Sequence, residues 1–155
     1  MRSLINKPLR SKVQPHPLAI TTLHLSTGLK KLRGLNFRQG SAAFRPCYLW
    51  RGMKNLATSD QFMVQGGSEL GVMSTTKDTH VATGYGASQK PLLFRIKVNS
   101  PMDMGAEVNW LSAFPRESEV IYPPLSMIQP LFKQKFKAQG MPQGDVITAT
   151  VSFPS

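Results

Sequence analysis

Residues 91–98 carry the clearest structural pattern in the chain. Three apolar residues, Phe94, Ile96 and Val98, alternate there with two cations. This period of two predicts a strand with one buried and one exposed face. Residues 146–153 alternate in the same way. A fold built around such strands has to cover one sheet face and leave the other in contact with solvent.

Shorter patterns predict the other elements. Leucines at helical intervals predict a helix over about residues 18–33 that ends at Gly34, with Lys30, Lys31 and Arg33 at its C-terminus, where cations suit the helix dipole. We expect further strands at 47–51, 70–73 and 119–122, a turn at 65–68 and a short helix at 78–87. A helix followed by short strands predicts an α+β fold with antiparallel strands rather than a wound parallel sheet.

Length and composition narrow the class of protein. The 155 residues predict a single domain, over residues 18–155. No stretch reaches the roughly 18 unbroken apolar residues of a membrane-spanning helix, so we expect a soluble protein. A single cysteine, Cys47, leaves the redox compartment open and favours a reducing one, such as the cytoplasm. Since His16, His24 and His80 are scattered, we expect no metal.

The net charge of +11 lies in the leading third of the chain. Residues 1–58 hold eleven of the 19 Lys and Arg and none of the 8 Asp and Glu. Such a start fits a targeting segment, a tether to anionic surfaces or solvated charge on a helix, and the sequence leaves these open. Residues 1–17 contain three prolines and no periodicity, which predicts a flexible, extended lead-in.

Two polar motifs follow predicted strands. Arg51 ends an apolar and aromatic segment and precedes Gly52. A guanidinium there can hold a phosphate or a ribose hydroxyl, and a glycine lets a ligand approach the backbone. Ser74, Thr75 and Thr76 offer three hydroxyls that can orient a carboxylate or a sugar. Each motif also has a structural explanation, as a surface cation or as the cap of the next helix.

A third motif, Glu117-Ser118-Glu119, places two carboxylates at the start of a predicted strand. The period of two puts both on one face, about 6–7 Å apart. One of two such acids can stabilise a developing oxocarbenium ion on a sugar, and the other can position and activate the nucleophile. An exposed strand start is the structural alternative for this pair.

Together, these motifs resemble the Arg–Ser–Glu class of mono-ADP-ribosyltransferases, in its arginine-specific Glu-x-Glu form. The likeness covers about residues 18–153 and includes the flanks at 66–72 and 105–115. The middle motif ends in threonine where serine is commoner. The helical region ahead of Arg51 is short for this family, and a truncated copy or a fragment of a larger protein is therefore one expectation.

The resemblance implies an NAD site between two small, roughly perpendicular antiparallel sheets with helices alongside. Glu119 would bind the ribose 2′-hydroxyl and stabilise the oxocarbenium ion, and Ser74 would orient Glu119. Arg51 would hold the phosphate and ribose side of NAD, and Gly52 would offer backbone groups to the nicotinamide amide. Glu117 would position and deprotonate an arginine acceptor.

The resemblance also implies further contacts with NAD, the co-substrate, and with a target protein. Thr75 and Thr76 would complete the NAD site. The loop 111–116, with Phe114 at its tip, would face the target. Either Tyr85 or Trp110 can stack on a ring of the cofactor, although core packing is the favoured explanation for both.

Two other functions stay open at this point. An NAD glycohydrolase would use water in place of the acceptor. A rival of another class is an inactive domain whose basic residues 1–58 bind nucleic acid or an anionic membrane. The even balance of charge after residue 58 argues against nucleic acid, because its binders usually spread positive charge over the folded face.

Overall fold

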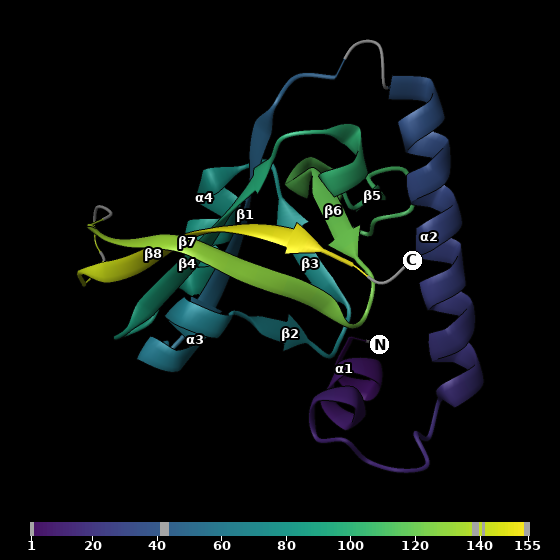
Figure 1. The fold of residues 1–155 in the computed structure, drawn as a ribbon, viewed down its shortest axis with the longest axis horizontal. Helices are drawn as coiled ribbons and strands as arrows, with labels where there is room; N and C mark the ends of the chain where they lie inside the picture. The colour runs from purple at the N-terminus through teal and green to yellow at the C-terminus, as the bar shows by residue number, and fades with distance from the viewer. Residues whose placement is uncertain (1, 41–43, 138–139, 141, 154–155) are drawn as a thin grey trace.

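The computed structural model describes residues 2–40, 44–137, 140 and 142–153, and Figure 1 shows its ribbon. The helices are α1 (Arg2–Arg10), α2 (Ala19–Gly40), α3 (Asp60–Gln65) and α4 (Thr79–Gly86), with short 3-10 helices η2 (Pro101–Asp103) and η3 (Pro115–Glu117). The strands are β1 (Cys47–Lys54), β2 (Gly67–Glu69), β3 (Met73–Thr76), β4 (Pro91–Val98), β5 (Ala106–Glu107), β6 (Glu119–Tyr122), β7 (Ser126–Phe136) and β8 (Gly144–Ser152). None of the described helices is long and apolar enough to cross a membrane.

The eight strands form one sheet in the order β2-β7-β8-β4-β1-β3-β6-β5. One half holds β2, β7, β8, β4 and β1, the other holds β3, β6 and β5, and among the described residues they are joined where Trp50 of β1 pairs with Thr76 of β3. The predicted α+β class is confirmed, and the two sheets that the resemblance implied are connected at this pair. The expectation of antiparallel strands is wrong for β4 and β8, which run parallel. Strand β8 lies between β4 and β7, so it has a parallel neighbour in β4 and an antiparallel neighbour in β7.

The main core draws on strands from both halves of the sheet. Its buried members are Leu49, Met73, Leu92, Phe94, Ile96, Val98, Val120, Tyr122, Ile128, Ile147, Ala149 and Val151. The strand predicted at 91–98 is confirmed, with its three alternating apolar residues at most 6% exposed. The strands predicted at 119–122 and near 146–153 and the helix predicted at 78–87 are also present, with small shifts at their ends.

Helix α2 continues well beyond its predicted end. The expectation that Gly34 ends the helix is wrong, because a glycine costs a helix only about 1 kcal/mol and tertiary contacts hold this turn. The guanidinium of Arg33 donates to the Met104 carbonyl at 3.1 Å and lies 3.7 Å from the centre of the Phe153 ring. The cations expected at the C-terminus therefore lie inside the helix.

The leading residues form a helix that the sequence did not predict. The expectation of an extended lead-in over 1–17 is wrong for α1, which lies beside the sheet in Figure 1. Asn6 is buried, donates from Nδ2 to the Val72 carbonyl at 2.9 Å, and accepts from the Val72 N–H at 2.8 Å. Ile5 is only 3% exposed. These tertiary contacts stabilise a helix too short to be stable alone.

Several strand boundaries also differ from the prediction. Strand β1 continues past Gly52 to Lys54, beyond the predicted end at residue 51. The strand expected at 70–73 is wrong, because β2 ends at residue 69 and β3 begins at Met73, so that the three hydroxyl residues belong to β3. The longest strand, β7, was not predicted, since Pro130 interrupts its pattern where the register with β8 shifts.

Gly52 packs β1 directly against α4. A Cβ at this position would lie 2.0 Å from the Ala82 carbonyl oxygen and 2.4 Å from the Gly86 nitrogen. Both contacts are with backbone atoms of the helix, which cannot move aside like a flexible side chain. The glycine is therefore required for the close approach of strand and helix.

We expect Gly52→Ala to lower the free energy of unfolding by about 3 kcal/mol, at the upper end of the range for overpacked cores. The matched control is Gly34→Ala, where an added Cβ meets nothing within 4 Å. That change should raise stability by up to about 1 kcal/mol, because alanine favours a helix. Urea unfolding measures both, and equal stability of Gly52→Ala and the wild type would contradict the packing argument.

Candidate active site

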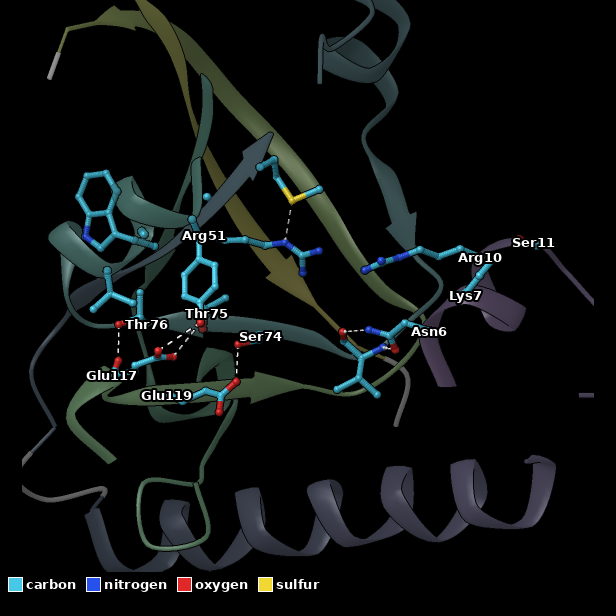
Figure 2. A pocket seen from close by; sticks show the side chains of 17 residues that line it. Asn6, Lys7, Arg10, Ser11, Arg51, Ser74, Thr75, Thr76, Glu117 and Glu119 are labelled. Atoms are coloured by element: carbon cyan, nitrogen blue, oxygen red, sulfur yellow. Dashed lines mark hydrogen bonds between the residues drawn. The ribbon is translucent and has the colours of Figure 1, made fainter. Parts of the chain in front are cut away.

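One cavity of about 610 Å³ lies where the two halves of the sheet meet. Trp50 and Thr76, which join the halves, both line it, as do side chains from α1, α4 and η3. Figure 2 shows this cavity from close by. All seven residues predicted for the site line it: Arg51, Gly52, Ser74, Thr75, Thr76, Glu117 and Glu119. The structure thus brings together three motifs that are far apart in the sequence.

Glu119 is a buried residue of the cavity lining. The residue is 9% exposed, and Oε1 accepts a hydrogen bond of 2.5 Å from the Ser74 hydroxyl. Ser112 Oγ lies 3.5 Å from the other carboxylate oxygen. The contact results from antiparallel pairing of β3 with β6, in which Thr76 lies opposite Glu119. A serine two positions away then reaches the carboxylate diagonally across the ladder.

Glu117 lines the same cavity, but its backbone is in a 3-10 helix and not in the predicted strand. It lies in η3, and Ser118 has a left-handed conformation with φ of 47°. The argument from strand alternation is therefore wrong, although both glutamates line the cavity. The Tyr85 hydroxyl donates to Glu117 Oε1 at 3.1 Å. The Glu117 carbonyl accepts from the Thr76 hydroxyl, which fixes the backbone beside the carboxylate.

Thr75 and Thr76 already use their hydroxyls in structural hydrogen bonds. Thr75 Oγ1 donates to the Val120 carbonyl at 2.7 Å. Thr76 Oγ1 accepts from the Asp78 N–H at 3.0 Å, and Asp78 caps α4 by accepting from the His80 N–H. Both threonines are buried and connect β3 to β6 and to the start of α4. These hydroxyls therefore hold β3 in place beside β6 and α4. The structural alternative in which Thr76 caps the next helix is wrong, because Asp78 caps α4.

A carboxylate that sequence reasoning missed, Glu69, organises the cationic side of the cavity. Arg51 Nη2 donates to Glu69 Oε2 at 2.9 Å. Arg10 donates from Nε and Nη2 to the two carboxylate oxygens at 2.9 and 3.0 Å. The Gly71 N–H adds a bond of 2.9 Å. In Figure 2 the guanidinium groups of Arg51 and Arg10 extend toward each other. No local pattern marks Glu69, because its partners depend on the docking of α1.

The electrostatic environment of Glu69 favours its ionised form. Burial alone raises the pKa of this carboxyl group. The hydrogen bonds from Arg10 and Gly71 and the charge of Arg51 outweigh burial, so that the pKa lies below its usual value. Both Arg51 and Glu69 are nearly buried, with side chains 11% and 12% exposed.

The cavity is electrically polarised. Lys7, Arg10 and Arg51 lie among its lining residues from α1 and β1, whereas Glu117 and Glu119 line it from η3 and β6. Such a cavity suits a ligand with a negative group at one end and a developing positive charge at the other. Among the described residues, no group of three or more His, Cys, Asp or Glu is placed to hold a metal ion.

Exposed aromatic residues lie at the cavity and in the segment that leads to Glu117. Tyr85 lines the cavity and is 49% exposed. Trp110 is 72% exposed, so the expectation that it packs in the core is wrong. In the loop 111–116, Leu111 and Phe114 are 63% and 65% exposed. These apolar side chains are accessible to a macromolecule that approaches the site.

Solved ADP-ribosyltransferases share this fold. HopU1 of Pseudomonas syringae pv. tomato DC3000 aligns with a TM-score of 0.63 and 19% identity over 94% of this chain and 63% of its own. Exoenzyme S from Pseudomonas aeruginosa aligns with a TM-score of 0.56 and 16% identity over 92% of this chain and 64% of its own. Vis from Vibrio splendidus aligns with a TM-score of 0.58 and 16% identity over 98% of this chain and 68% of its own. No protein-family model and no curated protein sequence matches the chain.

The likeness establishes the fold of the chain. The structure has the ADP-ribosyltransferase fold, with identities of 19% or less to these neighbours. The chain spans slightly less than two thirds of HopU1 and of exoenzyme S.

We expect Glu69→Gln to lower the free energy of unfolding at pH 7 by about 3 kcal/mol, since it leaves Arg51 without its buried counter-charge. The folded-state pKa of Glu69 lies below its ordinary value of about 4.3. This stabilisation is therefore present above that value and is lost as the pH falls through the folded-state pKa. Urea unfolding from pH 7 to pH 3 should show the two proteins converging in acid.

The control is Glu107→Gln, which removes an exposed ion pair with Lys77. It should cost less than about 1 kcal/mol at neutral pH. A constant difference between the wild type and Glu69→Gln across the pH range would contradict the ionic role of Glu69.

Proposed function

We propose that this protein is an NAD-dependent mono-ADP-ribosyltransferase that modifies arginine side chains of a target protein. The observation that carries the proposal is the convergence of Arg51, Ser74, Glu117 and Glu119 in one cavity, with Ser74 bonded to Glu119. The fold supports NAD as the co-substrate, since its neighbours are described as ADP-ribosyltransferases and exoenzyme S was solved bound to Carba-NAD.

The charges of the cavity fit NAD in one orientation. Lys7, Arg10 and Arg51 outnumber the single carboxylate of Glu69 on this side of the cavity, so its excess positive charge suits the pyrophosphate. In this orientation the nicotinamide ribose lies toward Glu119, and Gly52 offers backbone groups to the nicotinamide amide. The volume of about 610 Å³ lies within the range of small-molecule sites.

The proposed role of Glu119 is electrostatic. Nicotinamide leaves as a neutral ring from a cationic one, so the leaving group needs no general acid. The difficult part is the positive charge that develops on the ribose. A buried carboxylate already oriented by Ser74 stabilises that charge without having to reorganise first. Glu119 also accepts a hydrogen bond from the ribose 2′-hydroxyl in this arrangement.

The proposed role of Glu117 is to activate the acceptor. A guanidinium group is protonated at neutral pH and has to lose a proton to attack the ribose. Glu117 lines the cavity and is less buried than Glu119, and its carboxylate can both orient this group and accept its proton. Vis was solved in complex with agmatine, which carries a guanidinium group. The exposed loop 111–116, with Phe114 at its tip, faces the target protein in this proposal.

We expect Glu119→Gln to abolish release of nicotinamide from NAD, and Glu117→Gln to abolish transfer to arginine while some hydrolysis of NAD remains. The measurement combines nicotinamide release with labelling of an arginine-rich protein by NAD labelled in its ADP-ribose part. Thermal unfolding controls for the fold of both variants. Equal loss of both activities in the two variants would contradict the separate roles, and release without any labelling by the wild type would identify an NAD glycohydrolase.

We expect Tyr85→Phe to reduce arginine transfer by about tenfold and to leave NAD hydrolysis nearly unchanged. The change removes only the hydroxyl that donates to Glu117, worth roughly 1.5–3 kcal/mol for a bond to a charged group. The ratio of transfer to hydrolysis measures this effect. A parallel fall in both rates would instead place Tyr85 on the NAD side of the reaction.

A further inference from the structure

One face of the sheet carries aromatic and cationic side chains that the proposed reaction does not use. Tyr48 and Phe132 are each 44% exposed, and Lys97 is exposed between their strands. Tyr48 lies directly opposite Lys97 in the β1–β4 pair. Arg95 and Phe132 both pair with Thr148 of β8, from its two sides. We refer to these five residues as the sheet-face patch.

Arg95 is fixed at the centre of the sheet-face patch. Its Nε donates to Thr148 Oγ1 at 2.9 Å. Its guanidinium carbon lies 5.1 Å from the centre of the Tyr48 ring and 5.6 Å from that of Phe132. Both distances are within the range of about 6 Å for cation–π contacts. The patch therefore presents two partly exposed rings with a positive charge held between them.

The sheet-face patch is cationic and continues into a second hollow of the surface. It contains two cations and no carboxylate. Tyr48 also lines a second cavity, of about 510 Å³, whose lining includes Arg45 and Lys77. Glu107, which lines this cavity too, forms an ion pair with Lys77 at 2.6 Å. Arg45 is exposed, so it extends the positive surface beyond Tyr48.

We propose that the sheet-face patch binds single-stranded nucleic acid. Unpaired bases can stack on Tyr48 and Phe132, and backbone phosphates can contact Arg95, Lys97 and Arg45. Stacking on aromatic side chains within a cationic groove is the general physical basis of single-strand binding. A duplex hides the faces of its bases, and an anionic membrane offers phosphates without bases. RNA and DNA share unpaired bases and phosphates, so both bind.

This inference goes beyond the proposed transferase activity and does not depend on it. None of the five patch residues is among the residues that line the cavity of the candidate active site, although Trp50, on the same face of β1 as Tyr48, is one of those lining residues. A nucleic acid on the sheet-face patch can therefore bind while NAD occupies the cavity. Glu119→Gln, which removes the proposed chemistry, should bind the oligonucleotide as the wild type does.

The test is the fluorescence anisotropy of labelled 15-nucleotide oligouridine and oligodeoxythymidine, titrated with the full chain over a range of salt concentrations. We expect Tyr48→Leu and Phe132→Leu to weaken binding about 5- to 100-fold each, because leucine keeps apolar area but cannot stack. The matched control is Phe114→Leu, an exposed aromatic residue outside the patch, which should bind normally. Lys97→Gln should reduce the slope of log affinity against log salt by about 0.7.

Three outcomes would overturn the proposal. The first is unchanged binding by both Tyr48→Leu and Phe132→Leu in proteins whose thermal unfolding matches the wild type. The second is binding of a 15-base-pair duplex as tightly as the single strands. The third is binding of anionic phosphatidylserine vesicles without binding of either oligonucleotide. Loss of single-strand binding in the leucine variants, with Phe114→Leu unaffected, supports it.

Discussion

The register between β3 and β6 is the constraint on which the candidate site depends. In this register Thr76 lies opposite Glu119 and Ser74 lies opposite Ile121. A slip of one residue would turn the Glu119 side chain to the other face of the sheet. The buried hydrogen bonds of Thr75 and Thr76 with backbone carbonyls oppose such a slip. The motif of three hydroxyls thus holds the strands in register while its first member contacts the carboxylate.

The cationic side of the cavity depends on an ion-pair cluster that connects three segments of the chain. Glu69 accepts hydrogen bonds from Arg51 of β1 and Arg10 of α1, and Asn6 attaches the same helix to the backbone of Val72. The side chain of Arg51 is largely buried, and removal of its counter-charge would leave an uncompensated cation there. The same carboxylate therefore fixes α1 at the cavity and sets the direction of Arg51.

The sequence predicted what its local patterns encode. Short motifs drew attention to Arg51, Ser74 and Glu119, and the resemblance of their order and flanks to the Arg–Ser–Glu class joined them into one predicted site. Alternation predicted the central strands. Helix α1 and Glu69 could not be predicted in this way, since their partners lie about 60 residues away in sequence. Strand β7 was missed for a related reason, because its pairing with β8 tolerates a proline that local patterning treats as a break.

Strand β1 connects the two surfaces discussed above. Its odd-numbered residues, such as Leu49 and Arg51, face the core and the polarised cavity. Its even-numbered residues lie on the opposite face, where Gly52 approaches α4 and Tyr48 contacts Arg95, and two of them, Trp50 and Gly52, also line the cavity. Because α4 packs against only one end of this face, the other end keeps its rings and cations exposed. In these two proposals, one strand supplies Arg51 for chemistry and Tyr48 for binding a polyanion.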